Sequence, residues 1–387
     1  MKEINLNNAA TSGKKPDIAI EAMVNYIKAN DFKAAGRGGG ADFIELEGRL
    51  ALAGLFGITK DDDLLNIIFT SSATMSLNMI INGALKKGDH VITTSLEHNA
   101  VARPLALLEE KGIIELTYMP CEKDGNIDVS SLAAYIKPNT KLMIMTHASN
   151  VTGAILPYEH CAKIAKEHGV NFVLDAAQTA GLIDINFERS DIAALVFTGH
   201  KTLMGPVGTG GFIIKSRFAE ILEPFISGGT GSISHLLKHP EFMPDKFSAG
   251  TPNTLGILGL TASVNFINKT RPANILKHEL ALMEQFIDGV SCEDIIIYGP
   301  SERVPLLSFN IKGVDNGILE GVLYNKFNLA SRSGLHCSPL AHKSLGTYPK
   351  GALRISFGYF NTADEVSYAI EAINKIIKNK EGIEKWI

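Results

Sequence analysis

The feature that most constrains the fold is a regular alternation of short apolar runs with amphipathic stretches between about residues 64 and 215. Short runs without a polar face predict strands buried between two layers of helices. We therefore expect an α/β fold with a doubly wound, mainly parallel sheet. Its seven strands are expected at Leu65–Thr70, His90–Thr94, Ile114–Met119, Lys141–Thr146, Asn171–Asp175, Ala193–Thr198 and Gly211–Lys215. Helices are expected at Thr74–Lys86, Asn99–Lys111 and Tyr158–His168.

The pattern changes after Thr251-Pro252-Asn253 to a long helical region with a basic break at Lys269–Pro272. Strands are expected near Leu306–Asn310 and Leu353–Phe357, and a final helix at about Thr362–Lys380. A chain of 387 residues is long for one compact unit. We expect a large α/β domain over residues 16–262 and a smaller α+β domain over residues 263–387, against which residues 1–15 pack.

Composition narrows the class of function. A formal net charge of −4 argues against a nucleic-acid or anionic-membrane surface. No signal peptide or long apolar span is visible, so a cytoplasmic location is expected. The four cysteines have no zinc-like spacing, so we expect no metal site and no disulfide framework. Cys121, Cys161 and Cys292 are expected to be small structural hydrophobes.

Two residues at the ends of successive strands carry the first chemical signal. Asp175 ends one apolar run, and Lys201 follows the next, 26 residues later. Each alone has a plain alternative, a helix N-cap for Asp175 and a solvated loop lysine for Lys201. Together they meet the needs of pyridoxal 5′-phosphate (PLP), which requires an amine for a Schiff base and a carboxylate that keeps its ring nitrogen protonated. Ligands of such sheets bind outside the carboxyl ends of the strands.

Other residues are expected at the same edge. Ser71-Ser72-Ala73-Thr74 joins a strand to a helix and would direct backbone N–H groups at a phosphate, although an ordinary helix cap explains the segment equally well. Thr198 and His200 flank Lys201 and could add phosphate contacts. His98 follows another strand and could stack on a planar ring, its alternative being a structural hydrogen-bonding role.

The sequence resembles the cysteine desulfurase family, which has the class V aminotransferase fold (PLP fold type I), and is more similar to its group II (SUF-type) branch and to related selenocysteine lyases. The matching segments span almost the whole chain. They are Asn7–Ser12, Phe69–Asn78, Glu97-His98, Ser149–Ala154, Asp175–Gln178, Thr198–Lys201, Ala249–Asn253, Arg332–Cys337 and Arg354.

The resemblance implies a role for each matched residue. Lys201 would carry the cofactor, Asp175 would pair with its ring nitrogen, Gln178 with its ring hydroxyl, and His98 would stack on the ring. The other cofactor-binding residues implied are Ala73, Thr74, Asn150, Thr198, His200 and Thr251, the last reaching across from a second subunit of a homodimer. The substrate-binding residues implied are Ala10, Asn150, Arg332 and Arg354. For Arg354 a surface ion pair remains the alternative.

Cys337 is the position that implies a desulfurase. It should lie in a short turn-rich loop, where Arg332, His336 and His98 would favour its thiolate. The implied reaction converts L-cysteine to L-alanine: Lys201 takes the α-proton, Cys337 receives the sulfur as a persulfide, and an acceptor protein or thiol removes it. His98 would carry protons.

Four positions depart from the family pattern. Asn99 stands in place of a second histidine, Ala73 in place of a phosphate-binding threonine, and Met75 in place of a glutamate. Thr198 replaces the more usual serine and keeps its hydroxyl group. Three alternatives remain open at this point. The first is a selenocysteine lyase acting on L-selenocysteine, the second a class V aminotransferase or epimerase, and the third a non-catalytic subunit that positions a sulfur-transfer partner.

Overall fold

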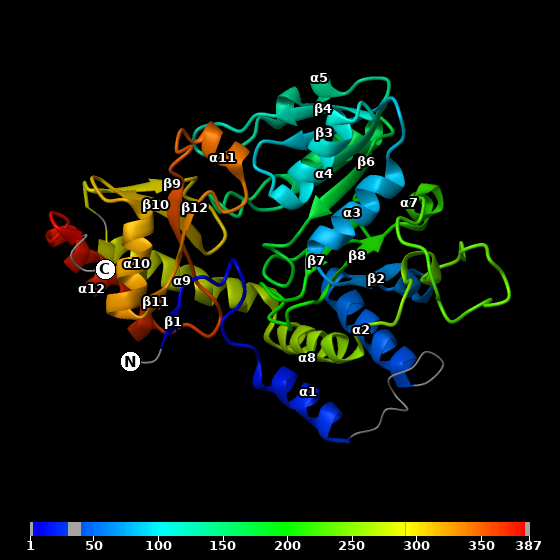
Figure 1. Cartoon of the computed structure of the whole chain (residues 1–387), viewed down its shortest axis with the longest axis horizontal. Coiled ribbons are helices and arrows are strands. Elements are labelled where there is room, and N and C mark those ends of the chain that lie inside the picture. Colours follow the sequence, from blue (N-terminus) through cyan, green and yellow to red (C-terminus); the bar gives the residue numbers. More distant parts are fainter. Residues whose placement is uncertain (1–2, 30–39, 291, 384–387) are drawn as a thin grey trace.

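The computed structural model describes residues 3–29, 40–290 and 292–383, and its centre is the expected seven-stranded sheet (Figure 1). The strands are β2 (Ile67–Thr70), β3 (Asp89–Thr94), β4 (Ile114–Met119), β5 (Thr140–Thr146), β6 (Asn171–Asp175), β7 (Ala194–Thr198) and β8 (Gly210–Ile214). Their order is β2-β8-β7-β6-β5-β3-β4, and β8 runs antiparallel to both neighbours. All seven expected strands are confirmed, with ends that differ by at most two residues.

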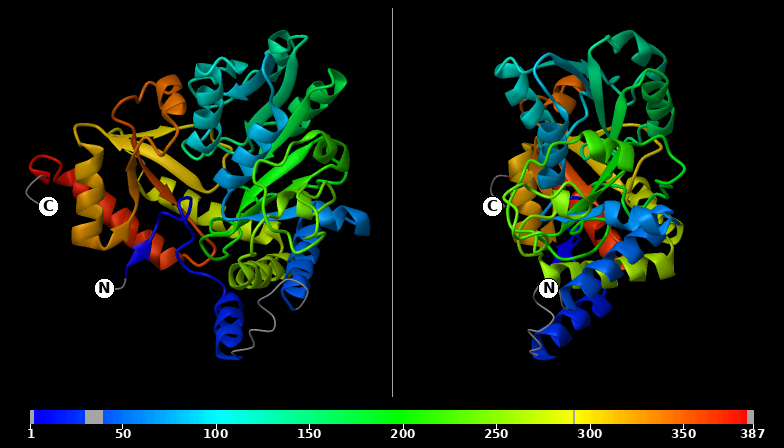
Figure 2. Two further views of the ribbon diagram at one scale, coloured as in Figure 1. Left: turned by 45° about the vertical axis from the view of Figure 1, so that its right-hand side comes forward. Right: turned by 90° about the vertical axis from the view of Figure 1, so that its right-hand side faces the viewer.

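The unbroken apolar runs are explained by the two faces of this sheet. Ile67 and Leu195 belong to the hydrophobic cluster on one face of the sheet. Their neighbours Ile68 and Val196 belong to the cluster on the other face. Side chains alternate across a strand, so a strand covered on both faces needs apolar residues at every position. Helices cover both faces, as the two views of Figure 2 show.

The helices of this part of the chain are α1 (Asp17–Ala29), α2 (Gly40–Phe56), α3 (Ala73–Ala84), α4 (Asn99–Glu110), α5 (Leu132–Tyr135), α6 (Tyr158–Glu167), α7 (Ser216–Ile221) and α8 (Thr254–Thr270). Three of them, α3, α4 and α6, confirm the helices expected between the strands, with ends that differ by at most two residues, and α1, α2, α5 and α7 were not predicted. The expected break after α8 is at Arg271, whose φ of 74° is left-handed. The chain then continues into α9 (Pro272–Val290).

The C-terminal part forms a separate layer. Its antiparallel sheet has the order β12 (Arg332–Gly334), β13 (Ala352–Ser356), β10 (Leu306–Ile311) and β9 (Ile295–Tyr298). The helices here are α10 (Asn316–Phe327), α11 (Pro339–Ser344) and α12 (Ala363–Lys378). Strand β1 (Ile4–Asn5) pairs in parallel with β11 (Leu329–Ala330), and Leu6 joins the third hydrophobic cluster, so the N-terminal strand packs on this layer. The residue boundaries of the two domains stay a prediction.

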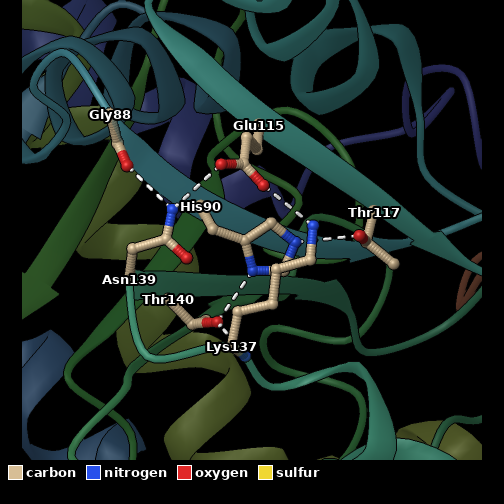
Figure 3. Close-up of polar contacts among 7 residues, drawn as sticks. All are labelled: Gly88, His90, Glu115, Thr117, Lys137, Asn139 and Thr140. Carbon is tan, nitrogen blue, oxygen red and sulfur yellow. Dashed lines mark hydrogen bonds and ion pairs between the residues drawn. The ribbon is translucent and has the colours of Figure 1, made fainter.

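A polar network closes the amino end of the central sheet (Figure 3). His90 is buried, and its ring nitrogens contact the hydroxyl groups of Thr140 at 2.7 Å and Thr117 at 2.8 Å. Lys137 and Glu115 form an ion pair of 2.9 Å beside it. This end of β3 and β4 is therefore satisfied internally, and the unpaired polar groups described below lie at the opposite, carboxyl edge.

Within the ranges that the structure describes, no helix combines the length and the apolar character needed to cross a bilayer.

Candidate active site

A cavity of about 220 Å³ lies at the carboxyl edge of the sheet, between the two layers of the molecule. All but one of the residues expected at the site line this cavity. They are Ala10, Ala73, Thr74, His98, Asn150, Asp175, Gln178, Thr198, His200, Lys201, Arg332, Cys337 and Arg354. Residues almost 350 positions apart in the sequence therefore meet in one place.

Thr251 is the exception. It lines a different hollow, together with Met75 and Asn253. The expectation was that Thr251 would serve the site of a second subunit, and this expectation stays a prediction.

Lys201 and Asp175 both line the cavity, where Asp175 is buried and Lys201 is half-buried. Burial lowers the pKa of Lys201 to about 8, although the nearby Asp175 opposes this shift. Burial also raises the pKa of Asp175, and a hydrogen bond from the backbone N–H of Ala177 at 2.9 Å opposes that shift. The solvated-lysine alternative does not fit, because Lys201 is half-buried and lines the cavity. No α-helix follows Asp175, so the N-cap alternative is wrong too.

The polar atoms near Lys201 fit a phosphate group. Thr198 Oγ1 and His200 Nδ1 are buried and have no hydrogen-bond partner among the described residues. Unpaired buried polar groups are costly, so such atoms point to a ligand that satisfies them. Ser72 caps α3 by accepting from the N–H of Met75 at 3.2 Å, and the cap reading of that segment is confirmed. Thr74 is exposed at the first turn of α3.

His98 is fixed at the start of α4. Its Nδ1 accepts a hydrogen bond from the backbone N–H of Ala100 at 3.0 Å, which makes the residue the N-cap of that helix. Burial, together with the charges of Lys201 and the nearby arginines, lowers the pKa of His98 to about 4. The ring is therefore neutral near pH 7.

Arg354 points into the cavity from β13. It is only 3% exposed, so the surface ion-pair alternative is wrong. Its Nη1 donates to the backbone oxygen of Asn150 at 2.9 Å, and its Nη2 donates to Asn7 Oδ1 at 3.2 Å. Its Nε finds no acceptor within the described chain. Burial lowers the pKa of Arg354 to about 10, so the guanidinium stays charged at neutral pH.

Cys337 lies in the expected short loop, between β12 and α11, and its side chain is exposed. The guanidinium Nη2 of Arg332 lies 4.0 Å from its sulfur. The expectation that His336 and His98 supply positive charge to the thiol is wrong. Burial lowers the pKa of His336 to about 2, and His98 is neutral as well, so the positive charge near the thiol comes from Arg332, Arg354 and Lys201 instead.

The other three cysteines differ in their burial. Cys121 and Cys161 are buried, as expected for small structural hydrophobes. Cys292 is exposed in the turn before β9, so the structural expectation is wrong for this residue. A position at an element edge cannot distinguish the two outcomes from sequence.

Two residues of the site were not assigned a role from sequence. Asn7 binds Arg354 as described above. Glu97 precedes His98 in the chain and is fully buried, and its Oε1 accepts from Thr94 Oγ1 at 2.6 Å and from the N–H of Thr146 at 3.0 Å. Burial raises the pKa of Glu97 to about 8. Both residues stand in segments that carry the family resemblance, and Glu97 also follows a predicted strand at the carboxyl edge of the sheet, but neither signal assigns a role.

The side-chain amides of Asn150 and Gln178 already have protein partners. Gln178 Nε2 donates to the backbone oxygen of Ala9 at 3.2 Å. Asn150 Nδ2 donates to the backbone oxygen of His336, and its Oδ1 accepts from Ser338 Oγ, both at 2.7 Å. The expectation of direct ligand contacts by these two residues stays a prediction.

Comparisons with known proteins give one consistent answer. The model of the aminotransferase class V family matches residues 4–368. A probable cysteine desulfurase of Pyrococcus abyssi is 32% identical over 97% of this chain and 94% of its own length. One from Methanothermobacter thermautotrophicus is 29% identical over 95% and 94%. The apo structure of the cysteine desulfurase from Thermococcus onnurineus is similar with a TM-score of 0.88 and 31% identity, covering 97% of this chain and 95% of that one.

Proposed function

The chain belongs to the class V aminotransferase family and is a PLP-dependent cysteine desulfurase, and we propose that Lys201, Arg354 and Cys337 carry its reaction. The observation that supports these roles is their meeting in one cavity. A half-buried lysine, a buried guanidinium and an exposed thiol line the same cavity of about 220 Å³. An ordinary aminotransferase has no use for the thiol.

Arg354 binds the carboxylate of L-cysteine. Its guanidinium is almost fully buried and keeps its charge. The planar guanidinium group can donate two parallel hydrogen bonds to the two oxygens of a carboxylate. Arg332, which lies at the exposed side of the cavity near Cys337, adds a second positive charge for the same anionic substrate.

The buried polar groups of the site that have no hydrogen-bond partner among the described residues suggest where the cofactor binds. Thr198 and His200 would hold the phosphate, Asp175 would pair with the ring nitrogen, and His98 would lie against the ring. PLP, when bound, withdraws electrons from the carbon skeleton of the amino acid.

Lys201 takes the proton from Cα of the substrate. A pKa of about 8 leaves a useful share of this amine neutral near physiological pH. His98, neutral in this environment, can accept and return a proton as the product forms.

Sulfur transfer occurs at Cys337. Its thiolate forms a bond to the substrate sulfur, and the carbon–sulfur bond breaks with its electron pair staying on the carbon side. A proton then completes L-alanine, so L-cysteine and the enzyme thiol give L-alanine and a persulfide on Cys337. The exposed position of Cys337 lets an acceptor protein or thiol take the sulfur.

The active unit is a homodimer in which Thr251 reaches the site of the second subunit. Exposed apolar side chains support an interface: Ile18, Ile20, Val24 and Ile27 on α1 and Phe43 on α2. A cytoplasmic location and a role in iron–sulfur assembly remain parts of this proposal.

The test is anaerobic incubation of the PLP-loaded enzyme with L-cysteine and a thiol reductant. Alanine and sulfide should form in equal amounts, and without reductant the Cys337 peptide should gain the mass of one sulfur atom. Cys337→Ala should abolish both signals, and Cys292→Ala, which removes the other exposed cysteine, should abolish neither. Sulfide formation that persists in Cys337→Ala would refute the role of this thiol.

The same variant distinguishes cysteine desulfuration from selenocysteine cleavage, because selenocysteine cleavage does not strictly need the thiol. If Cys337→Ala still releases selenide from L-selenocysteine, the enzyme has both capacities. Keto-acid or D-amino-acid products without sulfide would instead indicate a different class V activity.

A further inference from the structure

Three consecutive residues around the nucleophile are each held by a hydrogen bond to the large domain. The backbone oxygen of His336 accepts from Asn150 Nδ2, and the hydroxyl of Ser338 donates to Asn150 Oδ1, both at 2.7 Å. Between them, the backbone oxygen of Cys337 accepts from the N–H of Asn99 at 2.7 Å. A single side-chain amide therefore holds both neighbours of the reactive cysteine.

The backbone that these bonds hold is strained. His336 has a φ of 49° and Cys337 a φ of 58°, so two successive residues with side chains occupy the left-handed region. Such conformations persist only when surrounding contacts enforce them. Ser338 and His336 are both buried, so the bonds to Asn150 are shielded from water.

Asn150 also contacts the group that binds the substrate carboxylate. Its backbone oxygen accepts from Arg354 Nη1 at 2.9 Å. One residue in the loop after β5 is therefore bonded to the flanks of the nucleophile and to the guanidinium of Arg354. The position of the Cys337 sulfur relative to the substrate is then defined through this residue.

We propose that Ser338 and Asn150 form a latch that positions the Cys337 sulfur for sulfur transfer, with both as positioning residues. The inference rests on the proposed role of Cys337 and goes beyond it. The hydroxyl of Ser338 has no part in holding the cofactor or the substrate, so its removal should affect the sulfur-transfer step selectively.

The decisive variant is Ser338→Ala in the full-length, PLP-loaded enzyme. The rate of persulfide formation on Cys337 in a single turnover should fall roughly 10- to 100-fold, because misplacing a reacting atom by about 1 Å has that effect. KM for L-cysteine and the change in cofactor absorbance on adding L-cysteine should stay within about twofold, because Arg354 and Lys201 are untouched. Ser338→Thr, which keeps the hydroxyl, should restore most of the rate.

The matched control is Ser344→Ala. This serine lies at the end of α11, and its hydroxyl contacts Ser95 at 3.3 Å, away from the loop. Hydrogen exchange of the peptide over residues 332–340 should rise in Ser338→Ala and not in Ser344→Ala. This readout does not depend on activity, so it still tests the latch if Cys337 proves not to accept sulfur.

Two results would overturn the latch. One is an unchanged persulfide rate and unchanged exchange in Ser338→Ala. The other is a loss of cofactor absorbance and substrate binding in parallel with the rate, which indicates a general structural role.

Discussion

Arg354 donates a hydrogen bond from Nη2 to the side-chain oxygen of Asn7 across 347 residues of sequence, at 3.2 Å. The partner is a neutral amide, although a carboxylate would be the more usual companion of a buried guanidinium. The positive charge of Arg354 is therefore not neutralised by Asn7 and remains available for an anion, which we propose to be the carboxylate of the substrate. Asn7 fixes the orientation of the guanidinium without neutralising it.

Asn7→Asp should weaken substrate binding. The new carboxylate would pair with the buried guanidinium and compete with the substrate carboxylate, so KM for L-cysteine should rise about tenfold, equivalent to about 1.4 kcal/mol of binding free energy. The turnover number should change less. Steady-state sulfide release measures both constants.

Asn7→Ala is the control for this prediction. It removes the hydrogen bond without adding a charge, so its KM should rise less than that of Asn7→Asp. Equal KM values for Asn7→Asp and the wild type would contradict the proposed charge effect.

The fold could be predicted because its signals are local. Strands such as Ile114–Met119 and Asn171–Asp175 are short apolar runs between helical patterns, and their ends were found to the residue. Strands β1, β9, β11 and β12 were not predicted. The pairs β1–β11 and β12–β13 join distant segments, and two or three residues carry too little periodicity to identify a strand.

The membership of the site could be predicted, but its electrostatics could not. The carboxyl edge of the sheet and the family resemblance together identified thirteen residues that line the cavity. The histidines were wrongly expected to carry charge, because the burial that lowers the pKa of His336 to about 2 arises from the packing of distant segments. A hydrogen bond between distant segments, such as the one that Arg354 donates to Asn7, cannot be recognised from a local sequence pattern.

Glu97→Gln should become more stable relative to the wild type as pH rises from about 5 to about 8. Burial raises the pKa of Glu97 to about 8, so in this range the folded protein binds a proton that the unfolded chain releases. The stability of the wild type therefore falls with rising pH, by up to about 1.4 kcal/mol per pH unit for one such group. Glutamine mimics the protonated acid and lacks this dependence.

Urea unfolding of the cofactor-free proteins at several pH values measures the difference. Glu279, whose pKa burial also raises to about 8, is common to both proteins and cancels. Parallel stability curves for the two proteins would show that Glu97 is ionised in the folded state. Glu97→Ala should be less stable than Glu97→Gln at every pH, because it leaves the N–H of Thr146 without its acceptor.

Thr198→Val should weaken PLP binding by about tenfold without destabilising the cofactor-free protein. The hydroxyl has no partner within the described residues, so its loss costs the free protein no hydrogen bond. Cofactor titration followed by absorbance measures the affinity. Thr202→Val is the matched control: its hydroxyl is also buried and unpartnered in the described structure, but it lines a different cavity. If both variants weaken PLP binding equally, Thr198 is not a phosphate ligand.

Loading of the cofactor-free enzyme with PLP should depend on pH through Lys201. Only the neutral amine attacks the aldehyde, so the loading rate should rise about tenfold per pH unit below about 8 and level off above it, because burial lowers the pKa of Lys201 to about 8. Asp175 opposes that shift, so Asp175→Asn should lower the pKa of Lys201 further and move the plateau to lower pH. Stopped-flow absorbance records the rates, with a free lysine derivative as the control for titration of PLP itself. A loading rate that still rises at pH 10 would show that the amine of Lys201 is not desolvated.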